Sequence, residues 1–496
     1  MPTRHFLAGL ACALVVWLSF FSGASRLGLI GPDEPRYASV ARAMADSGDW
    51  VTPRLNGEPW FEKPVLYYWG AAASFLAFGD SEAAARLPSA MAATAATLAV
   101  ALLAARTSGA PAAFAVLLIL PTTIAALAFS RGASTDMPFT GTLTLAFVAA
   151  AFVLMQTPEA GTPRTRWAAL LAWGASLGLS VLAKGPAGVL LAGGSIALWM
   201  LVTRRWREGL RLAHPAAIAT ALAVALPWYA LCALRNPEFF QVFVIEHNLQ
   251  RFLTPVFQHE QPVWYFALVL ILGFVPWTPL LAPAIRDAVR EIRGPRATVR
   301  TLALCWAIVP FVFFSASQSK LPGYILPIFP PLVLLMARSV ATSPARRDGP
   351  SLPPTAIGLL LVMLAAAAGT ALPDAAPEDT RGALAALGVS TTWPVALGGA
   401  AIGITLLGLR GQTWIAVGLT SIAMTLLFAA INLRIVPALD AQLTPRTAAA
   451  RAAAVANGDP IYVHDLDRSW RFGLDYYLRA APPTWDGAAM DGVIVT

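Results

Sequence analysis

Charge is scarce in this sequence, because only 12% of its 496 residues are Asp, Glu, Lys or Arg, whereas 57% are hydrophobic. A soluble domain of this length could not bury so much apolar surface. The composition therefore excludes an ordinary soluble enzyme and indicates an integral membrane protein.

Cysteine is also rare, and the sequence has no familiar nucleotide-binding pattern. Cys12, Cys232 and Cys305 are widely separated, and each lies in or beside an apolar segment. This spacing argues against a disulfide framework and against a Cys-based metal site. The sequence contains neither a G-x-x-x-x-G-K-[ST] loop nor a Rossmann glycine pattern, so we expect no nucleotide cofactor.

About thirteen apolar segments are each long enough for a transmembrane helix, which needs about 20 such residues. These segments lie near 6–24, 84–106, 110–128, 137–156, 166–183, 186–203, 212–234, 263–285, 301–317, 321–341, 353–373, 393–410 and 412–433. The predicted fold class is an all-α polytopic membrane protein. A cleaved signal peptide is the alternative for the first segment, because its start is basic and it ends in small residues.

Arginine is distributed unevenly among the loops. With the N-terminus inside, the inward loops carry most of the arginines, with dense groups at 204–211 and 286–300. Because positive residues stay on the cytoplasmic side, this distribution predicts an N-terminus inside and a C-terminus outside. It also accounts for the net charge of +8, so nucleic-acid binding is not needed to explain the basic composition.

We divide the chain into a transmembrane domain, 1–433, and a C-terminal domain, 434–496. The first domain includes a long outward loop, 25–83, in which the stretch 33–48 is expected to form a short amphipathic helix at the membrane interface. After residue 434, charges, turn residues and a short apolar run alternate. This pattern predicts a small α/β domain outside the membrane.

The first outward loop contains the densest mixture of charges in the chain. Its motif "PDEPRYA" supplies Asp33, Glu34 and Arg36, and "WFEKP" supplies Glu62 and Lys63 beside the next apolar stretch. On a helix, Asp33 would reach Arg36 at the i+3 spacing. A capped helix whose acidic residues meet its dipole would also explain the first motif. Ionisable groups at membrane depth, however, are costly and usually mark a functional site.

Further ionisable residues recur at the outward ends of other spans, namely Asp136, Lys184, Glu246, His247, Arg251 and Lys320. Each alone is more often a snorkelling or paired residue, but together they indicate a polar cavity that opens outward. Cations there could hold a phosphate, a carboxylate could act as a base, and aromatic rings could stack on a sugar. Because the sequence has no nucleotide-binding pattern, the energy for sugar transfer would have to come from an activated substrate. A polyprenyl-phosphate sugar would supply such an activated bond.

These motifs resemble those of GT-C membrane glycosyltransferases, specifically the lipid A aminoarabinose transferase (ArnT) type, which is related to protein O-mannosyltransferases. The resemblance extends to about residue 435, and it is carried by "PDEPRYASVARAMADSGDWVTPRLNGEPWFEKP", "TDMPF", "LAKGP", "FFQVFVIEHNLQRF" and "SQSKLPGYILPIFPPL". It implies the GT-C fold with about thirteen transmembrane helices, a periplasmic C-terminal domain and a polyprenyl-phosphate donor. Gly323 and the short C-terminal portion depart from the family's pattern.

The resemblance also implies roles for individual residues. The expected catalytic residues are Asp33, Glu34 and Lys63. The expected substrate-binding residues are Arg36, Tyr37, Asp136, Arg251, Lys320 and Tyr324, with Arg36 and Lys63 at the donor phosphate. Glu62 and His247 match positions associated with a divalent metal, expected to be zinc.

The implied function is transfer of 4-amino-4-deoxy-L-arabinose, or a related sugar, from undecaprenyl phosphate to lipid A phosphate. The enzyme would lie in the bacterial inner membrane, in contact with membrane lipid, with its active site facing the periplasm. One alternative keeps the donor type and changes the acceptor to a protein Ser or Thr hydroxyl or another glycan. Another alternative, of a different class, is a transporter or flippase of lipid-linked sugars. Against it, the polar residues gather on one side of the membrane, whereas a transport path would place them near the midplane.

Overall fold

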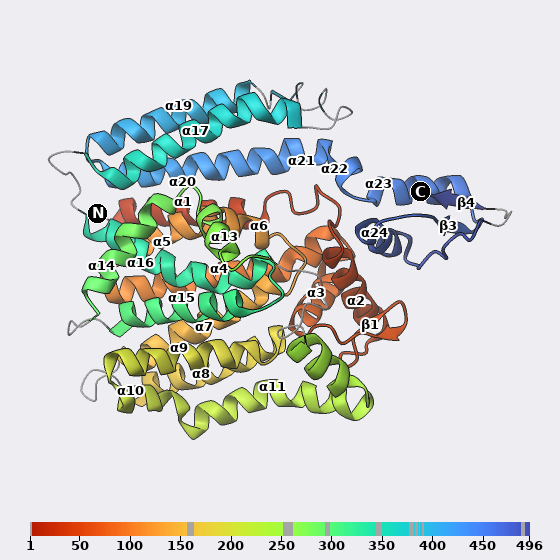
Figure 1. Ribbon diagram of the computed structural model, residues 1–496, viewed down its shortest axis with the longest axis horizontal. Coiled ribbons are helices and arrows are strands. Elements are labelled where there is room, and N and C mark those ends of the chain that lie inside the picture. Colours follow the sequence, from red (N-terminus) through yellow and green to blue (C-terminus); the bar gives the residue numbers. More distant parts are fainter. Residues whose placement is uncertain are drawn as a thin grey trace.

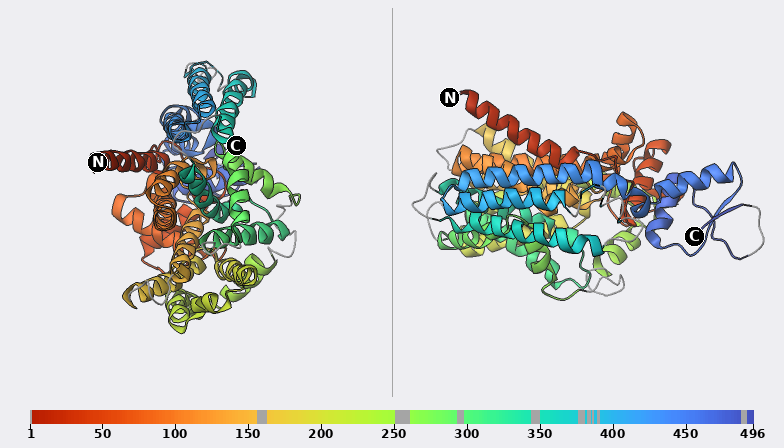
Figure 2. Two further views of the ribbon diagram at one scale, coloured as in Figure 1. Left: turned by 90° about the vertical axis from the view of Figure 1, so that its left-hand side faces the viewer. Right: turned by 90° about the horizontal axis from the view of Figure 1, so that it is seen from above.

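The computed structural model of the chain describes residues 2–155, 163–250, 261–292, 298–343, 350–375, 381, 385, 387–388, 391–487 and 492–496. Its largest part is a body of long helices that run side by side (Figure 1). The first outward loop and the C-terminal segment lie together at one end of this body. Two further views show that the C-terminal segment extends beyond that end (Figure 2).

The helical body follows the hydropathy of the sequence. Its helices are α1 (Pro2–Phe21), α4 (Glu82–Ser108), α5 (Ala110–Ile119), α6 (Ile124–Phe129), α7 (Asp136–Met155), α8 (Pro163–Lys184), α9 (Ala187–Thr203), α11 (Pro215–Arg235), α13 (Tyr265–Gly273), α14 (Leu281–Arg290), α15 (Thr298–Ala316), α16 (Phe329–Thr342), α17 (Leu352–Ala375), α19 (Thr392–Leu409) and α20 (Thr413–Ala430). Shorter helical segments between them are α10 (Trp206–Leu210), the π-helix Phe240–Gln250 and the 3-10 helix η5 (Pro322–Ile328). The predicted all-α architecture is confirmed.

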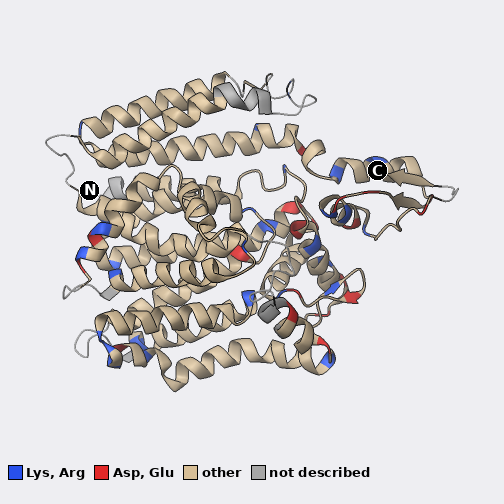
Figure 3. Ribbon diagram, viewed as in Figure 1, with Lys and Arg blue, Asp and Glu red and all other residues tan. Residues whose placement is uncertain are grey.

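Within the described ranges, eight helices are long and apolar enough to cross a membrane. A ninth candidate is the pair Tyr265–Gly273 and Thr278–Arg290, which is bent by 108°. Shorter apolar helices, including Phe6–Phe21 and Ala187–Thr203, coincide with other predicted spans. Charged residues lie mainly at the two ends of the body and are rare in its middle (Figure 3). The chain is therefore a multi-span membrane protein, as its composition predicts.

The helices of the body pack through small residues and stacked rings. A Cβ added to Gly141 of α7 would lie 2.8 Å from the carbonyl oxygen of Ala92 in α4, so these two backbones can approach only because position 141 is glycine. Deeper in the body, the rings of Phe147 and Trp306 stack with their centroids 4.4 Å apart. These contacts join α4, α7 and α15 into one core.

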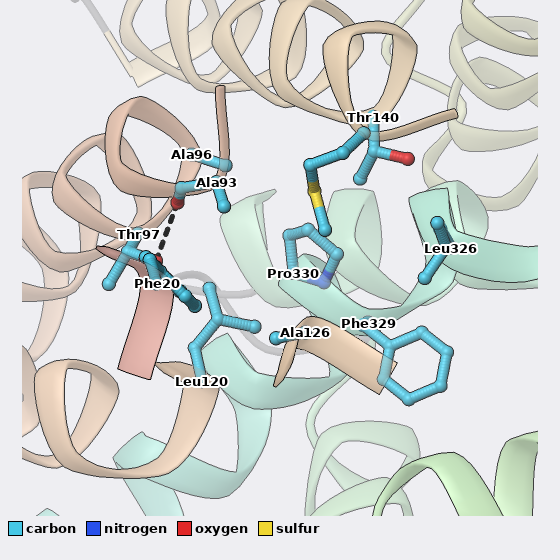
Figure 4. Close-up of a pocket in the computed structure, with 11 residues that line it drawn as sticks. Phe20, Ala93, Ala96, Thr97, Leu120, Ala126, Thr140, Leu326, Phe329 and Pro330 are labelled. Atoms are coloured by element: carbon cyan, nitrogen blue, oxygen red, sulfur yellow. Dashed lines mark hydrogen bonds between the residues drawn. The ribbon is translucent and has the colours of Figure 1, made fainter. Parts of the chain in front are cut away.

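A small cavity of about 20 Å³ lies inside the body, between α1, α4, α7 and α16 (Figure 4). Its lining is mostly apolar, and the Thr97 hydroxyl donates a hydrogen bond of 2.8 Å to the Ala93 carbonyl of its own helix. A space of this size holds about one water molecule at most. The cavity is therefore a packing gap, too small for a sugar or a lipid head group.

The first outward loop contains α2 (Asp33–Ser47), the short strands β1 (Arg54–Leu55) and β2 (Glu58–Pro59), and α3 (Leu66–Phe78). Helix α2 is the predicted amphipathic helix, and it ends at Gly48, whose φ of 69° suits glycine. The expected apolar face is buried, including Ala38, Val40, Ala41 and Met44. Burial of this face fixes the orientation of the charged residues at the start of the helix.

The C-terminal segment mixes helices and strands, as predicted. It comprises α21 (Val436–Ala438), α22 (Asp440–Leu443), α23 (Arg446–Ala456), β3 (Ile461–Val463), α24 (Arg468–Leu478) and β4 (Val493–Val495). Strands β3 and β4 pair in parallel, with Ile461 opposite Val493. Ala449, Val463 and Leu474 form a small apolar core of their own. The α/β character of this segment is confirmed.

Candidate active site

Four residues of the first outward loop form a compact group of charges, which we call the loop charge cluster: Asp33, Arg36, Glu62 and Lys63. The Arg36 guanidinium pairs with Asp33 one helical turn earlier, and it also lies 3.1 Å from a carboxylate oxygen of Glu62. Lys63 lies 3.2 Å from the other Glu62 oxygen. The Asp33 side chain is 50% exposed, whereas that of Arg36 is only 3% exposed. In this cluster the Asp33 carboxylate is therefore accessible to solvent, and the positive charge of Arg36 next to it is buried.

Arg36 is enclosed by aromatic rings. Its guanidinium carbon lies 5.3 Å from the ring centroids of Tyr37 and Trp60 and 5.4 Å from that of Phe472. Burial lowers the pKa of Arg36, but the combined attraction to Glu62, Tyr37, Asp33 and Tyr68 outweighs this effect and leaves the pKa raised. Its Nε and Nη1 groups are buried and have no hydrogen-bond partner among the described residues. Arg36 therefore stays charged and retains donors that its present contacts do not use.

Tyr37, the next residue, is buried and lies against other tyrosines. Its ring centroid is 6.1 Å from that of Tyr67 and 6.0 Å from that of Tyr68. Burial raises the pKa of Tyr37 well above its ordinary value, and the nearby Glu62 adds to the rise. Tyr37 is therefore a buried, uncharged side chain beside the loop charge cluster.

Glu34 points away from the loop charge cluster. Both of its oxygens accept hydrogen bonds from Arg86 of α4, at 2.6 and 3.2 Å, and from the backbone N–H groups of Ile30 and Ala133. The carboxylate is buried, and each of its oxygens accepts two hydrogen bonds. This setting fits a structural role, joining the first loop to α4 and to the loop before α7, better than the catalytic role expected from the motif.

A second polar group lies at the same end of the body. Lys184, the last residue of α8, pairs with Asp136, the first residue of α7. The Lys184 ammonium also lies 4.6 Å from the ring centroid of Tyr324 in η5. Lys320 is buried just before η5, where its ammonium donates a 2.7 Å hydrogen bond to the Ser317 carbonyl. Three of the predicted substrate-binding residues, Asp136, Lys320 and Tyr324, are thus found on neighbouring elements.

The two polar groups are connected by one apolar cluster. Ala133, three residues before Asp136, and Leu182, two residues before Lys184, belong to the same buried cluster as Phe61. Phe61 immediately precedes Glu62. The segments next to Glu62, Asp136 and Lys184 therefore share one apolar core, although they are far apart in the sequence.

Gly323 lies directly beside Asp136 of the second polar group. A Cβ added at this position would lie 2.8 Å from the carboxyl carbon of Asp136 and 3.0 Å from the ring of Phe129. Asp136 can therefore keep its place beside Lys184 because residue 323 has no side chain. This close approach gives a physical reason for glycine at position 323 of this chain.

Two of the predicted site residues cannot be placed. Arg251 and the side chain of His247 lie outside the described residues. The described part of the chain contains no group of three or more His, Cys, Asp or Glu side chains that could hold a metal ion. Zinc takes about four ligands, and Glu62, already close to two cations, is the one described member of the expected set. The zinc site therefore stays a prediction.

Several important neighbours of the site were not expected from the sequence. Arg86 holds Glu34, and Phe472 of α24 covers Arg36. Arg42 is a largely buried pairing residue: its guanidinium lies 2.8 Å from Asp80, and its guanidinium carbon lies 3.7 Å from the ring centroid of Tyr476. A single charged or aromatic residue in one segment gives no signal of a partner some 400 positions away.

The geometry can be compared with proteins of known family. Residues 6–243 match the family model described as dolichyl-phosphate-mannose-protein mannosyltransferase. Two curated relatives are named undecaprenyl phosphate-alpha-4-amino-4-deoxy-L-arabinose arabinosyl transferase. The one from Pseudomonas aeruginosa PAO1 is 37% identical over 320 residues, and the one from Edwardsiella ictaluri is 34% identical over 307 residues. These matches cover 64% and 62% of this chain, but only 56% and 54% of the relatives' own length.

Solved structures agree with these matches over nearly the whole chain. The crystal structure of ArnT from Cupriavidus metallidurans bound to undecaprenyl phosphate has a TM-score of 0.82 and 28% identity, and the alignment covers 99% of this chain and 87% of that one. The archaeal oligosaccharyltransferase AglB from Archaeoglobus fulgidus, at 13% identity and a TM-score of 0.53, shares the fold alone. The resemblance found in the motifs is thereby confirmed, and the chain is similar in sequence and in its GT-C fold to the ArnT-type membrane glycosyltransferases.

Proposed function

We propose that this protein transfers 4-amino-4-deoxy-L-arabinose from undecaprenyl phosphate to a phosphate of lipid A, at the periplasmic face of the bacterial inner membrane. The observation that carries the proposal is the loop charge cluster, in which Asp33 is reachable and Arg36 and Lys63 supply positive charge at the end of an apolar helical body. A polyprenyl phosphate has the matching form, with an apolar chain that stays in lipid and an anionic head at the surface. The names of the relatives supply the sugar and the donor.

The proposed reaction is a single displacement at C1 of the sugar. A lone pair of the acceptor oxygen forms the new bond to C1, and the bond from C1 to the donor phosphate breaks with its electron pair moving to the phosphate oxygen. Undecaprenyl phosphate leaves, and the configuration at C1 inverts. Arg36 and Lys63 stabilise the negative charge that develops on the departing phosphate.

Asp33 has a positioning role in this scheme. A lipid A phosphate is already largely anionic at neutral pH, so its oxygen needs little help from a base. Asp33 is paired with Arg36 and half exposed, which suits a carboxylate that orients the acceptor or the sugar amine. If the acceptor is a hydroxyl, the same carboxylate would remove its proton.

A second acceptor class is favoured by one observation, the match of residues 6–243 to a protein mannosyltransferase family model. In that case the acceptor is a protein Ser or Thr hydroxyl, or another glycan. Transport of a lipid-linked sugar has less support, because charged residues gather at the ends of the body (Figure 3), whereas a transport path would place polar groups near the midplane.

Mass spectrometry of lipid A distinguishes these possibilities. Lipid A is compared from cells with and without the gene, under conditions in which the donor is made. The proposal predicts the added mass of one or two aminoarabinose groups only when the gene is present. Unchanged lipid A together with a newly glycosylated protein would instead establish the hydroxyl acceptor.

Replacement of Gly323 by alanine is expected to lower transfer by about tenfold or more, because the new Cβ would push Asp136 away from Lys184. The initial rate of transfer by the purified protein measures this effect. Gly399→Ala is the matched control, since a Cβ at Gly399 of α19 would meet no atom within 4 Å. Equal rates for both variants would show that the position of Asp136 does not matter.

The metal prediction is tested separately. From the resemblance, we propose that purified protein carries a divalent metal near Glu62, with zinc expected, and that a strong chelator lowers transfer. Elemental analysis of the protein, with and without Glu62→Gln, measures the bound metal. A metal-free protein whose transfer resists chelation would mean that Glu62 serves only as the ion-pair partner of Arg36 and Lys63.

A further inference from the structure

Helix α24 of the C-terminal segment contacts the loop charge cluster directly. Phe472, in its first half, lies with its ring centroid 5.4 Å from the guanidinium carbon of Arg36. The same ring is 5.5 Å from the guanidinium carbon of Arg468, which is exposed. Phe472 also packs against the apolar cluster that contains Tyr37 and Phe61. The ring therefore lies over a residue assigned to the donor phosphate, although it comes from the far end of the chain.

The second half of α24 fixes the middle of α2. Arg42 donates a 2.8 Å hydrogen bond to the Tyr476 carbonyl, and its guanidinium carbon lies 3.7 Å from the centroid of the Tyr476 ring. The Tyr476 hydroxyl donates a 2.7 Å hydrogen bond to Asp80, which also pairs with Arg42 and Arg479. Tyr476 is buried, whereas Asp80 and Arg479 are exposed. Arg42 and Phe472 thus join the two helices at two points.

Two further contacts hold the ends of the first loop to the C-terminal segment. The backbone N–H of Leu29 donates a 2.8 Å hydrogen bond to the Tyr477 hydroxyl, which donates one of 3.0 Å to Glu82. The Gly28 N–H donates a 2.7 Å hydrogen bond to Asp440. The segment just before α2 is thereby fixed at the point where the chain leaves the membrane.

We propose that α24 is a positioning element of the active site, acting through Phe472 on Arg36 and through Tyr476 on Arg42. The inference rests on the proposed function for its catalytic consequence, whereas its structural consequence is independent of that function. Phe472 keeps water from the Arg36 guanidinium, which strengthens its attraction to Asp33 and Glu62. Tyr476 keeps α2 in the orientation that presents Asp33 outward.

The positioning role predicts a particular kinetic pattern. Phe472→Ala should lower kcat by about 10- to 100-fold, because the charges that stabilise the departing phosphate are no longer held in place. KM for the lipid acceptor should change much less, since Phe472 belongs to none of the predicted acceptor contacts. Phe472→Tyr keeps an aromatic ring over Arg36 and should restore most of the rate. Phe472→Leu, which keeps apolar bulk without the ring face, should fall between them.

The experiment uses the full-length protein in lipid nanodiscs with undecaprenyl-phosphate-linked aminoarabinose as donor and lipid A as acceptor. Trp470→Ala is the matched control, because it removes a large ring from the same helix but lies outside the apolar clusters found in the described residues. A loss of kcat in Phe472→Ala with rescue by Phe472→Tyr supports the inference. Equal kcat for Phe472→Ala and Trp470→Ala overturns it.

A second measurement does not depend on activity. Hydrogen–deuterium exchange should become faster across residues 33–42 in Phe472→Ala and in Tyr476→Ala, and it should be unchanged there in Trp470→Ala. Unchanged exchange in the two α24 variants would contradict the proposed coupling of α24 to α2. An inactive wild-type protein that still shows faster exchange in the variants would count against the proposed function and leave the positioning of α2 supported.

Discussion

Asp33→Asn is expected to reduce sugar transfer by about 100-fold, with the fold intact, because the acceptor or the sugar amine is no longer held in place. Asparagine keeps the size of the side chain and most of its hydrogen bonding but removes the negative charge. Asp33 is the half-exposed carboxylate of the loop charge cluster, and its charge is held by Arg36. The initial rate of transfer by purified protein, at matched protein amounts, measures the loss.

Asp46→Asn provides the control for this substitution. Asp46 lies on the same helix, α2, and is exposed to solvent. The same chemical change there should leave transfer within about twofold of wild type, since exposed substitutions away from a site have small effects. If Asp33→Asn transferred sugar at a similar rate, the carboxylate would have no essential part in the reaction.

Removal of either cation of the loop charge cluster is expected to have a comparably large effect. Arg36→Ala and Lys63→Ala should each lower kcat/KM by roughly 30- to 1,000-fold, which corresponds to about 2–4 kcal/mol of transition-state stabilisation. Arg36→Ala also leaves the nearly buried Glu62 carboxylate with one cation fewer. Because Arg36 offers a planar fork and Lys63 a compact charge, Arg36→Lys should restore little of the lost rate.

Arg54→Ala is the appropriate control for these two substitutions. Arg54 lies in the same loop, and its described hydrogen bond is to the exposed Gly57 carbonyl, at 3.1 Å. Arg42 is nearer to Arg36 in the sequence, but it is unsuitable as a control because it holds α2 against α24. Similar mild effects at Arg36, Lys63 and Arg54 would mean that the loop is only a charged anchor at the membrane surface.

The parts of the fold that depend on local sequence were predicted well. Long apolar runs determine the helical body, and the 3.6-residue spacing of Ala38, Val40, Ala41 and Met44 determines which face of α2 is buried. The contact between Asp33 and Arg36 follows from the same helical spacing. These features depend on residues within a few positions of one another, so hydropathy and periodicity are sufficient to find them.

The parts that depend on distant contacts were missed or assigned differently. Glu34 shares a motif with Asp33, yet the helix turns it toward Arg86 and away from the loop charge cluster. Phe472 and Tyr476 are ordinary aromatic residues in the sequence, and their role becomes visible only when α24 packs on α2. In both cases the partner that a side chain meets depends on tertiary packing, which composition and spacing do not encode.

The part of the loop charge cluster in catalysis is measured by the initial rate at which full-length purified protein moves labelled aminoarabinose from undecaprenyl phosphate to lipid A. Wild-type protein is compared with the double variant Arg36→Ala/Lys63→Ala at equal amounts of folded protein. We expect transfer by the wild type and a rate at background for the double variant. Equal transfer by both proteins would show that Arg36 and Lys63 are not needed, and no transfer by the wild type with intact donor and acceptor would contradict the proposed function.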